Sequence, residues 1–209
     1  MTVNRGKLIA FEGLDGCGKS TQLALLADAL DARGVDVVRT REPTEGEHGR
    51  RIREMARAGV RVDPREELSW FVADRREHVE RVIEPALAAG RTVLSDRYYL
   101  SSVAYQGARG LDPDGILAES EAAFPHPTLA ILVEIEPERG LERVKARLAG
   151  GGIAEPLFEE VAFLREVARV FAGLRLPYLV RVPGDDTPEA VHRRILRLVD
   201  DRLEWREPA

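Results

Sequence analysis

A glycine-rich run from Gly13 to Ser20, G-L-D-G-C-G-K-S, has the residue types and spacing of a phosphate-binding loop. Its glycines let the backbone turn so that successive N–H groups point at one centre, where they bind phosphate oxygens. Lys19 would reach the β- and γ-phosphates of a nucleoside triphosphate, and the Ser20 hydroxyl would bind Mg²⁺. The alternative is a glycine-rich turn that binds nothing.

The residues on either side of this run favour the phosphate loop. Leu8–Phe11 is a short apolar run typical of a buried strand, and the apolar residues Leu23, Leu26 and Leu30 recur at helical spacing after the loop. A strand, a glycine-rich turn and a helix in this order are the context that a phosphate loop requires. The predicted nucleotide-binding residues are Gly13, Leu14, Asp15, Gly16, Cys17, Gly18, Lys19, Ser20 and Thr21.

Strand-like and helix-like runs alternate along the whole chain, which predicts an α/β fold with a parallel sheet covered by helices on both faces. We expect five strands, over 8–11, 35–40, 92–95, 129–135 and 178–182. We expect helices over 21–30, 48–58, 64–89 and 157–174, others opening at Pro113 and Pro137, and a last one over 188–203. The Gly150–Gly152 triplet interrupts this pattern and predicts a short lid over about 148–160.

Composition restricts the class of protein. The chain has 209 residues, 44% hydrophobic and 32% charged, which is typical of one globular domain over 1–209. A net charge of -5 argues against nucleic acid or an anionic membrane as partner. The single cysteine excludes an internal disulfide, and no apolar run is long enough to span a membrane, so we expect a cytoplasmic protein.

Polar residues follow several of the predicted strands, and ligands bind at the carboxyl ends of such strands. The segments are the phosphate loop, Arg41–Pro43, Asp96–Tyr98 and an acidic stretch after the fourth strand. Asp96 is placed to hold Mg²⁺ with Ser20, and Arg97 is placed to neutralise phosphate oxygens. The alternative for Asp96 and Arg97 is a solvated ion pair at a strand end.

Two pairs of residues could recognise a nucleobase. Phe71 and Arg75 lie one helical turn apart, so an aromatic ring could stack on a base while a guanidinium donates hydrogen bonds to it. Their alternative is a core phenylalanine beside a surface arginine. Ser102 and Gln106 are also one turn apart, and their alternative is a solvated helix face.

A basic ridge precedes the glycine triplet. Arg139, Arg143 and Arg147 recur at every fourth residue, with Lys145 between the last two. Such a ridge could clamp the phosphates of ATP or form an exposed charged face, and the pattern leaves both open.

Four segments together resemble thymidylate kinases of the bacterial type. They are F-E-G-L-D-G-C-G-K-S-T-Q at 11–22, T-R-E-P at 40–43, F-V-A-D-R-R-E-H at 71–78 and D-R-Y-Y-L-S-S-V-A-Y-Q-G at 96–107. The resemblance implies a phosphate-loop kinase fold with a three-layer, five-stranded parallel sheet, and a homodimer. It implies phosphoryl transfer from Mg-ATP to dTMP, giving dTDP and ADP for dTTP synthesis.

The resemblance also implies roles for individual residues. Phe71 would stack on thymine, Arg75 and Gln106 would hydrogen-bond it, and Ser102 would lie nearby. Asp15 would approach the sugar 3′-hydroxyl, and Tyr105 would disfavour a 2′-hydroxyl. The residues implied to hold the acceptor phosphate are Arg41, Arg53 and Arg97.

The chain departs from the family pattern in the predicted lid. Leu157 stands before Phe158 and Glu159, where the family usually has an arginine that assists catalysis. We hypothesise that Arg147, or Lys145, supplies this charge, so the predicted catalytic residues are Lys19, Arg97, Asp15 and Arg147. The alternatives are a kinase for another deoxynucleotide and a nucleotide-binding protein with little turnover.

Overall fold

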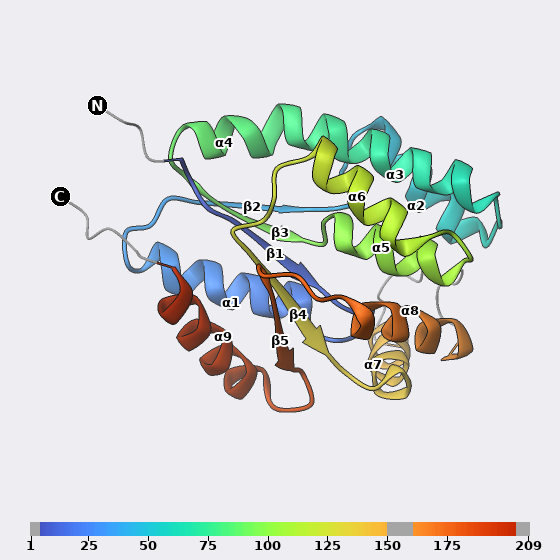
Figure 1. Cartoon of the computed structure of the whole chain (residues 1–209). Coiled ribbons are helices and arrows are strands. Elements are labelled where there is room, and N and C mark those ends of the chain that lie inside the picture. The colour runs from blue at the N-terminus through green and yellow to red at the C-terminus, as the bar shows by residue number, and fades with distance from the viewer. Residues whose placement is uncertain (1–4, 150–160, 204–209) are drawn as a thin grey trace.

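A computed structural model of the chain describes residues 5–149 and 161–203, except for the side chains of 147 and 148. Five strands of this part form one parallel sheet in the order β2-β3-β1-β4-β5, which confirms the predicted sheet (Figure 1). The strands are β1 Leu8–Glu12, β2 Val37–Arg41, β3 Thr92–Asp96, β4 Leu129–Glu134 and β5 Leu179–Pro183. The predicted lid lies mostly outside the described residues.

Helices cover both faces of the sheet, so the fold has three layers with the sheet in the middle (Figure 1). One face is covered by α1 Lys19–Asp31 and α9 Pro188–Arg202, which contact each other. On the opposite side lie α3 Pro64–His78, α4 Glu84–Ala88, α5 Tyr99–Ala108, α6 Pro113–Ala123 and α8 Val161–Gly173. The remaining helices are α2 Glu47–Ala58, which packs on α3, and α7 Pro137–Ala149, which packs on α8.

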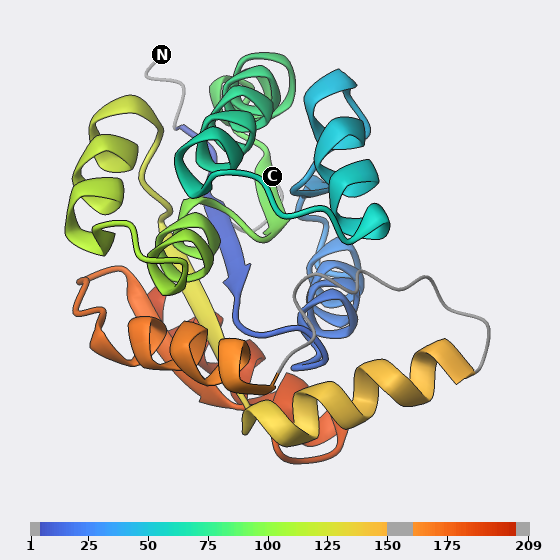
Figure 2. The ribbon, with the colours of Figure 1, turned by 90° about the vertical axis from the view of Figure 1, so that its right-hand side faces the viewer.

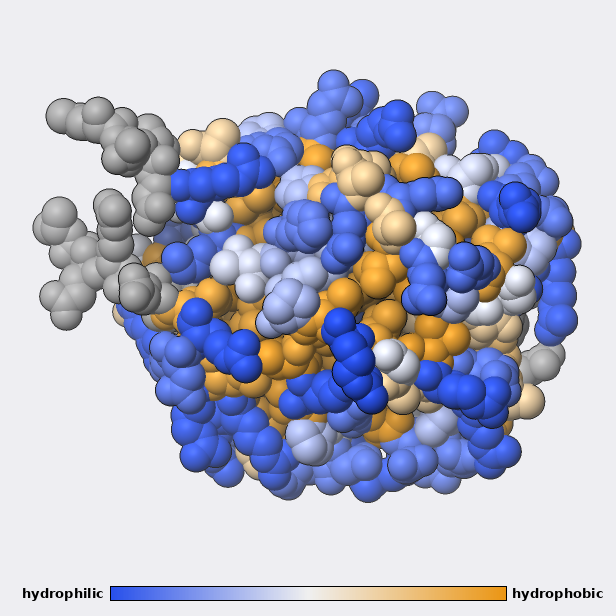
Figure 3. Space-filling model, in the orientation of Figure 1, coloured by the Kyte–Doolittle hydropathy of each residue, from blue (hydrophilic) through white to orange (hydrophobic). Residues whose placement is uncertain are grey.

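The core lies between the sheet and these two helical layers. Ile9, Leu26, Val167 and Ile195 come from different elements and are all fully buried. Each such side chain stabilises the fold by about 1.5–3 kcal/mol relative to an exposed position. Figure 3 shows the face seen in Figure 1, where apolar residues gather across the middle and hydrophilic residues dominate the margins. No helix in the described part of the chain is both long and apolar enough to cross a membrane.

Local sequence signals explain where α3 begins and why the predicted helix over 64–89 is not continuous. The Asp63 side chain accepts hydrogen bonds from the N–H groups of Arg65 and Glu66, as expected of an N-cap before Pro64. A π-helical segment, η1 Val79–Ile83, separates α3 from α4. Pro85 lacks an N–H and its ring would clash with the carbonyl one turn earlier, which a widened π turn relieves.

The strand register aligns the polar ends of three neighbouring strands. Asp96 at the end of β3 is level with Phe11 of β1 on one side and with Arg41 of β2 on the other. Figure 2 looks at the molecule from the side toward which the strands point, where the start of α1 and the start of α7 lie near this edge. The fold therefore collects the segments after β1, β2 and β3 at one place.

Candidate active site

The phosphate loop connects β1 to α1 in the predicted manner. Gly16 and Gly18 have φ angles of 80° and 101°, which strongly favour glycine. A Cβ on Gly16 would lie 2.1 Å from the Gly140 carbonyl oxygen, so the loop packs directly on α7. The Lys19 ammonium is buried and donates to the carbonyls of Gly13 and Leu14, at 3.1 and 2.8 Å.

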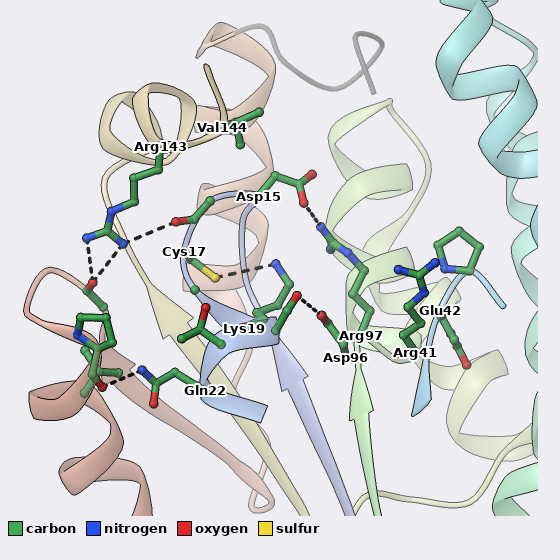
Figure 4. Close-up of a pocket in the computed structure, with 18 of the residues that line it drawn as sticks. Asp15, Cys17, Lys19, Gln22, Arg41, Glu42, Asp96, Arg97, Arg143 and Val144 are labelled. Atoms are coloured by element: carbon green, nitrogen blue, oxygen red, sulfur yellow. Dashed lines mark hydrogen bonds and ion pairs between the residues drawn. The ribbon is translucent and has the colours of Figure 1, made fainter. Parts of the chain in front are cut away.

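A pocket of about 650 Å³, the larger pocket, opens beside this loop (Figure 4). Its walls are the phosphate loop with the start of α1, the segment from Arg41 to Pro43, the end of β3, and parts of α2, α7 and α9. The lining includes Lys19 and Arg97, so cationic groups face this space from more than one element.

The Ser20 hydroxyl and the Asp96 carboxylate meet at one side of the larger pocket, where Ser20 Oγ donates to Asp96 Oδ2. One carboxylate and one hydroxyl are oxygen ligands of the kind that Mg²⁺ uses together with waters and phosphates. The pair therefore fits Mg²⁺. Among the described residues, no group of three or more acidic, histidine or cysteine side chains could hold a metal without such additional ligands.

Arg97 and Asp15 form an ion pair between the end of β3 and the phosphate loop (Figure 4). Arg97 Nη2 lies 2.6 Å from Asp15 Oδ1, and Tyr105 contacts the other carboxylate oxygen at 3.3 Å. Burial alone would raise the pKa of Asp15, but the charges of Arg97 and Lys19 outweigh it and lower that pKa to about 2. Asp15 is therefore ionised at neutral pH.

The backbone of Arg97 adopts a φ of 74°, which is unusual for a residue with a side chain. Three hydrogen bonds hold this turn. The Arg97 N–H donates to the Phe11 carbonyl at 2.8 Å, and Ser95 Oγ donates to the Arg97 carbonyl at 2.7 Å. The next N–H, of Tyr98, donates to Glu12 Oε1 at 3.0 Å.

Glu12 links this turn to the Arg97 side chain. The Ser101 hydroxyl donates to Glu12 Oε2 at 2.5 Å, and Arg97 Nη1 donates to Ser101 Oγ at 3.0 Å. Burial raises the pKa of Glu12 to about 7, although the Ser101 hydrogen bond and the Arg97 charge act in the opposite direction. The sequence did not indicate a role for Glu12, because a residue that directly follows the apolar run 8–11 is expected to be the end of a buried strand.

A second, smaller pocket adjoins the first and shares Asp15, Glu42, Pro43, Arg53 and Arg97 with it. Its lining contains the residues predicted to recognise the acceptor, which are Phe71, Arg75, Ser102, Tyr105 and Gln106. The structure thus brings these five together from α3 and α5. Ser102 and Gln106 are buried, so they are not part of a solvated helix face.

Arg75 is 1% exposed and is held by three partners. Its Nε lies 2.8 Å from Glu42 Oε2, and its Nη2 donates to Ser102 Oγ at 2.9 Å and to the Tyr98 carbonyl at 3.3 Å. Its Nη1 has no hydrogen-bond partner within the described structure. Arg75 is therefore not the surface arginine that the alternative reading expected, and it keeps one donor group unused.

Arg41 and Arg53 both line the larger pocket, and Glu45 lies between them. The Glu45 carboxylate contacts Arg41 through one oxygen and lies 2.7 Å from Arg53 Nη2 through the other. Two arginines that share one carboxylate form a pair suited to a larger anion such as a phosphate.

Three predictions for other segments had different outcomes. Arg143 of the basic ridge lines the larger pocket and donates to the carbonyls of Gly16 and Gly184, at 3.4 and 3.3 Å (Figure 4). The acidic stretch after β4 does not line either pocket, and its Glu138 instead pairs with Arg165 of α8. The side chain of Arg147, and Leu157, lie outside the described residues.

The loop between β5 and α9 lines the larger pocket, although sequence reasoning did not place it there. A Cβ on Gly184 would lie 3.2 Å from the carbonyl oxygen of Cys17, so this loop touches the phosphate loop. The contact depends on β5 pairing with β4 at the edge of the sheet, and no local motif signals that pairing.

A parallel sheet with a phosphate loop after its central strand, a hydroxyl–carboxylate pair and surrounding arginines defines the phosphate-loop kinase class. Comparison with known proteins specifies the family. A family model described as "Thymidylate kinase" matches residues 11–195. The chain belongs to the thymidylate kinase family.

Named relatives of similar length agree with this family. The chain is 43% identical to the thymidylate kinase of Desulfotalea psychrophila over 203 residues, which cover 97% of this chain and 98% of that one. It is 41% identical to the thymidylate kinase of Akkermansia muciniphila over 95% of this chain and 94% of that one. It is 45% identical to that of Xanthomonas campestris pv. campestris, over 95% and 86%.

Proposed function

We propose that this protein transfers the γ-phosphoryl group of ATP to dTMP, giving dTDP and ADP for dTTP synthesis. The observation that carries the choice of acceptor is a pair of buried groups in the lining of the smaller pocket that have no hydrogen-bond partner in the described part of the chain. Arg75 Nη1 is a donor and Gln106 Oε1 is an acceptor. Thymine presents a carbonyl beside an N–H on its base-pairing edge, so this donor and acceptor match it, whereas cytosine presents the reverse pattern.

The larger pocket holds the donor nucleotide. The N–H groups of the phosphate loop and the Lys19 ammonium bind the ATP phosphates, and Arg143 contacts the nucleotide from α7. Support for this assignment comes from the glycine geometry of the loop and from Arg143 reaching the Gly16 carbonyl in the same pocket.

Ser20 and Asp96 hold Mg²⁺ in this proposal. When bound, Mg²⁺ neutralises charge on the donor phosphate oxygens. The adjacency of the Ser20 hydroxyl and the Asp96 carboxylate beside the phosphate loop supports this pair as its ligands.

The smaller pocket holds the acceptor. Phe71 stacks on the base, while Tyr105 and the ionised Asp15 contact the sugar. The shared lining of the two pockets, which includes Asp15, Arg53 and Arg97, is where the acceptor phosphate meets the donor. Arg41, Arg53 and Arg97 hold that phosphate in line with the γ-phosphorus.

The chemical step requires little more than positioning and charge. An oxygen of the acceptor phosphate bonds to the γ-phosphorus as the bond to the β–γ bridging oxygen breaks, and ADP leaves. The attacking oxygen is already charged, so no general base is needed. Lys19 and Arg97 stabilise the charge that spreads over the transferring group. Asp15 fixes the orientation of Arg97 through their ion pair.

We further propose a cytoplasmic homodimer, as the resemblance to bacterial thymidylate kinases implies. Sedimentation analysis of the purified protein tests the dimer, and a monomer at micromolar concentration would contradict it. Fractionation of the source cells tests the compartment.

A panel of acceptors tests the proposed function. With ATP and Mg²⁺, we expect the highest kcat/KM for dTMP, a lower but measurable value for dUMP, and at least about hundredfold lower values for dCMP and dGMP. Thymidine lacks the phosphate that the arginines bind, so it should not react. A preference for dCMP, dGMP or thymidine would assign the chain to another kinase activity.

A further inference from the structure

The side-chain amide of Gln106 has a donor end and an acceptor end, and the end that faces the smaller pocket decides which base edge fits there. The residue lies on α5, is 1% exposed and lines that pocket beside Arg75. Its Nε2 has a partner on α3, whereas its Oε1 has none among the described residues.

The partner of Nε2 is the carboxylate of Glu67, which is completely buried. Gln106 Nε2 donates to Glu67 Oε1 at 2.8 Å, and the Arg109 guanidinium contacts the other carboxylate oxygen. In its ion pair with the Arg109 guanidinium, the Glu67 carboxylate offers oxygens that accept hydrogen bonds, so the end of Gln106 that faces it has to be a donor. Glu67 therefore admits only the amide nitrogen of Gln106 on its side and leaves the oxygen for the pocket.

We propose that Glu67 is a positioning residue that sets acceptor selectivity by fixing the hydrogen-bond polarity of Gln106. This inference rests on the proposed function, in which the smaller pocket holds the acceptor base. Gln106 Oε1 accepts from a ring N–H such as N3–H of thymine and repels the ring nitrogen of cytosine, which is itself an acceptor. A site built around one polarity rejects the opposite polarity because its buried polar groups are left unpaired.

The substitution Glu67→Gln tests this mechanism. Arg109 would then pair with the amide oxygen of the new side chain, whose nitrogen would face Gln106 and turn the Gln106 amide around. We expect kcat/KM for dTMP to fall at least about tenfold and the inhibition constant of dCMP to fall as well, by about threefold to tenfold. The KM for ATP should stay within about twofold.

Opposite changes in the binding of dTMP and dCMP separate an effect on hydrogen-bond polarity from a general loss of structure. A pocket that is merely loosened binds both dTMP and dCMP more weakly. Gln106→Met removes the amide and should weaken the binding of dTMP without strengthening the binding of dCMP. Adding Glu67→Gln to Gln106→Met should then leave the preference for dTMP over dCMP the same as in Gln106→Met alone, because Glu67 acts through Gln106.

Two further variants keep the test valid. Glu67→Gln with Arg109→Gln removes both charges together, so no buried charge is left unpaired if the single variant is unstable. In that variant either end of the Gln106 amide can face the pocket, so the preference for dTMP over dCMP should fall at least about tenfold. Glu121→Gln removes a carboxylate that accepts from Tyr178 and does not line the smaller pocket, and it should leave the preference unchanged.

The outcomes are distinguishable from failure of the proposed function. If the unmodified protein does not prefer dTMP, the proposed function itself is wrong. If it does prefer dTMP, and Glu67→Gln weakens dTMP and dCMP in parallel or changes neither, the role of Glu67 is overturned.

Discussion

Two buried carboxylates near the end of β1 have pKa values that are shifted in opposite directions. Asp15 is in direct contact with Arg97, and that charge lowers its pKa to about 2 despite burial. Among the described residues, the Glu12 carboxylate accepts hydrogen bonds from the Ser101 hydroxyl and the Tyr98 N–H, and burial outweighs them and raises its pKa to about 7. The side chain that faces the pockets is therefore charged, and the one behind it titrates near neutral pH.

The raised pKa of Glu12 predicts a pH dependence of stability. Between its ordinary value of 4.5 and about 7, the folded protein keeps a proton on Glu12 that the unfolded chain has released. The folded state then binds more protons, so the free energy of unfolding falls as pH rises through this window. Glu12→Gln should remove a part of that fall on the order of 1–3 kcal/mol.

Urea unfolding of both proteins at several pH values between about 4.5 and about 7.5 measures this difference. The exposed Glu66 offers a control, because Glu66→Gln should leave the pH dependence unchanged. Parallel curves for the unmodified protein and Glu12→Gln would show that Glu12 does not titrate in this window.

At the residue scale, the sequence predicted the side chains that line the pockets better than the side chains that hold these lining residues in place. Phe71 and Arg75 could be selected because helical spacing puts them on one face. Glu67 could not, since its partner Gln106 lies 39 residues away and only the packing of α3 on α5 brings the two together. Glu12 was missed for the same kind of reason, with Ser101 89 residues away.

At the scale of elements, α7 is the part of the site whose role is least determined by local sequence. Its start packs so closely on the phosphate loop that a Cβ on Gly140 would lie 2.7 Å from the Asp15 carbonyl oxygen. Arg143 follows less than one turn later and lines the larger pocket, whereas Lys145 is exposed. The basic ridge is thus divided between the pocket and the solvent.

The position of α7 leads to a prediction about the missing lid arginine. Arg147 lies one turn beyond Arg143, and our hypothesis from the sequence is that it, or Lys145, supplies charge to the transferring phosphoryl group. Arg147→Ala or Lys145→Ala should lower kcat at least about tenfold while the KM for dTMP changes little. Steady-state kinetics measure this, with the exposed Arg165 of α8 as the control for loss of one positive charge.

If neither alanine variant lowers kcat by that amount, or if Arg165→Ala lowers it equally, the hypothesis about Arg147 and Lys145 is wrong.

The sequence allowed α7 to be predicted because Pro137 marks its start. The π segment within the helix over 64–89 could not be predicted, because Pro85 sits in an otherwise uninterrupted helical pattern.

At the scale of the whole molecule, the order of the strands creates the site. β1 lies between β3 and β4, so the phosphate loop emerges beside the end of β3, which carries Asp96 and leads into Arg97. The alternation of strands and helices predicted a parallel sheet with its ligands at this edge. It did not predict the order of strands, which depends on long-range pairing and places the β5–α9 loop in the larger pocket.

The central claim is that the two adjoining pockets hold a donor and an acceptor for one phosphoryl transfer. The most direct test is to incubate the purified protein with ATP, Mg²⁺ and dTMP and to separate the nucleotides over time. We predict equal amounts of ADP and dTDP, and a loss of at least about a thousandfold in rate for Lys19→Ala with its fold retained. Nucleotide binding without dTDP, or unchanged turnover in Lys19→Ala, would contradict the claim.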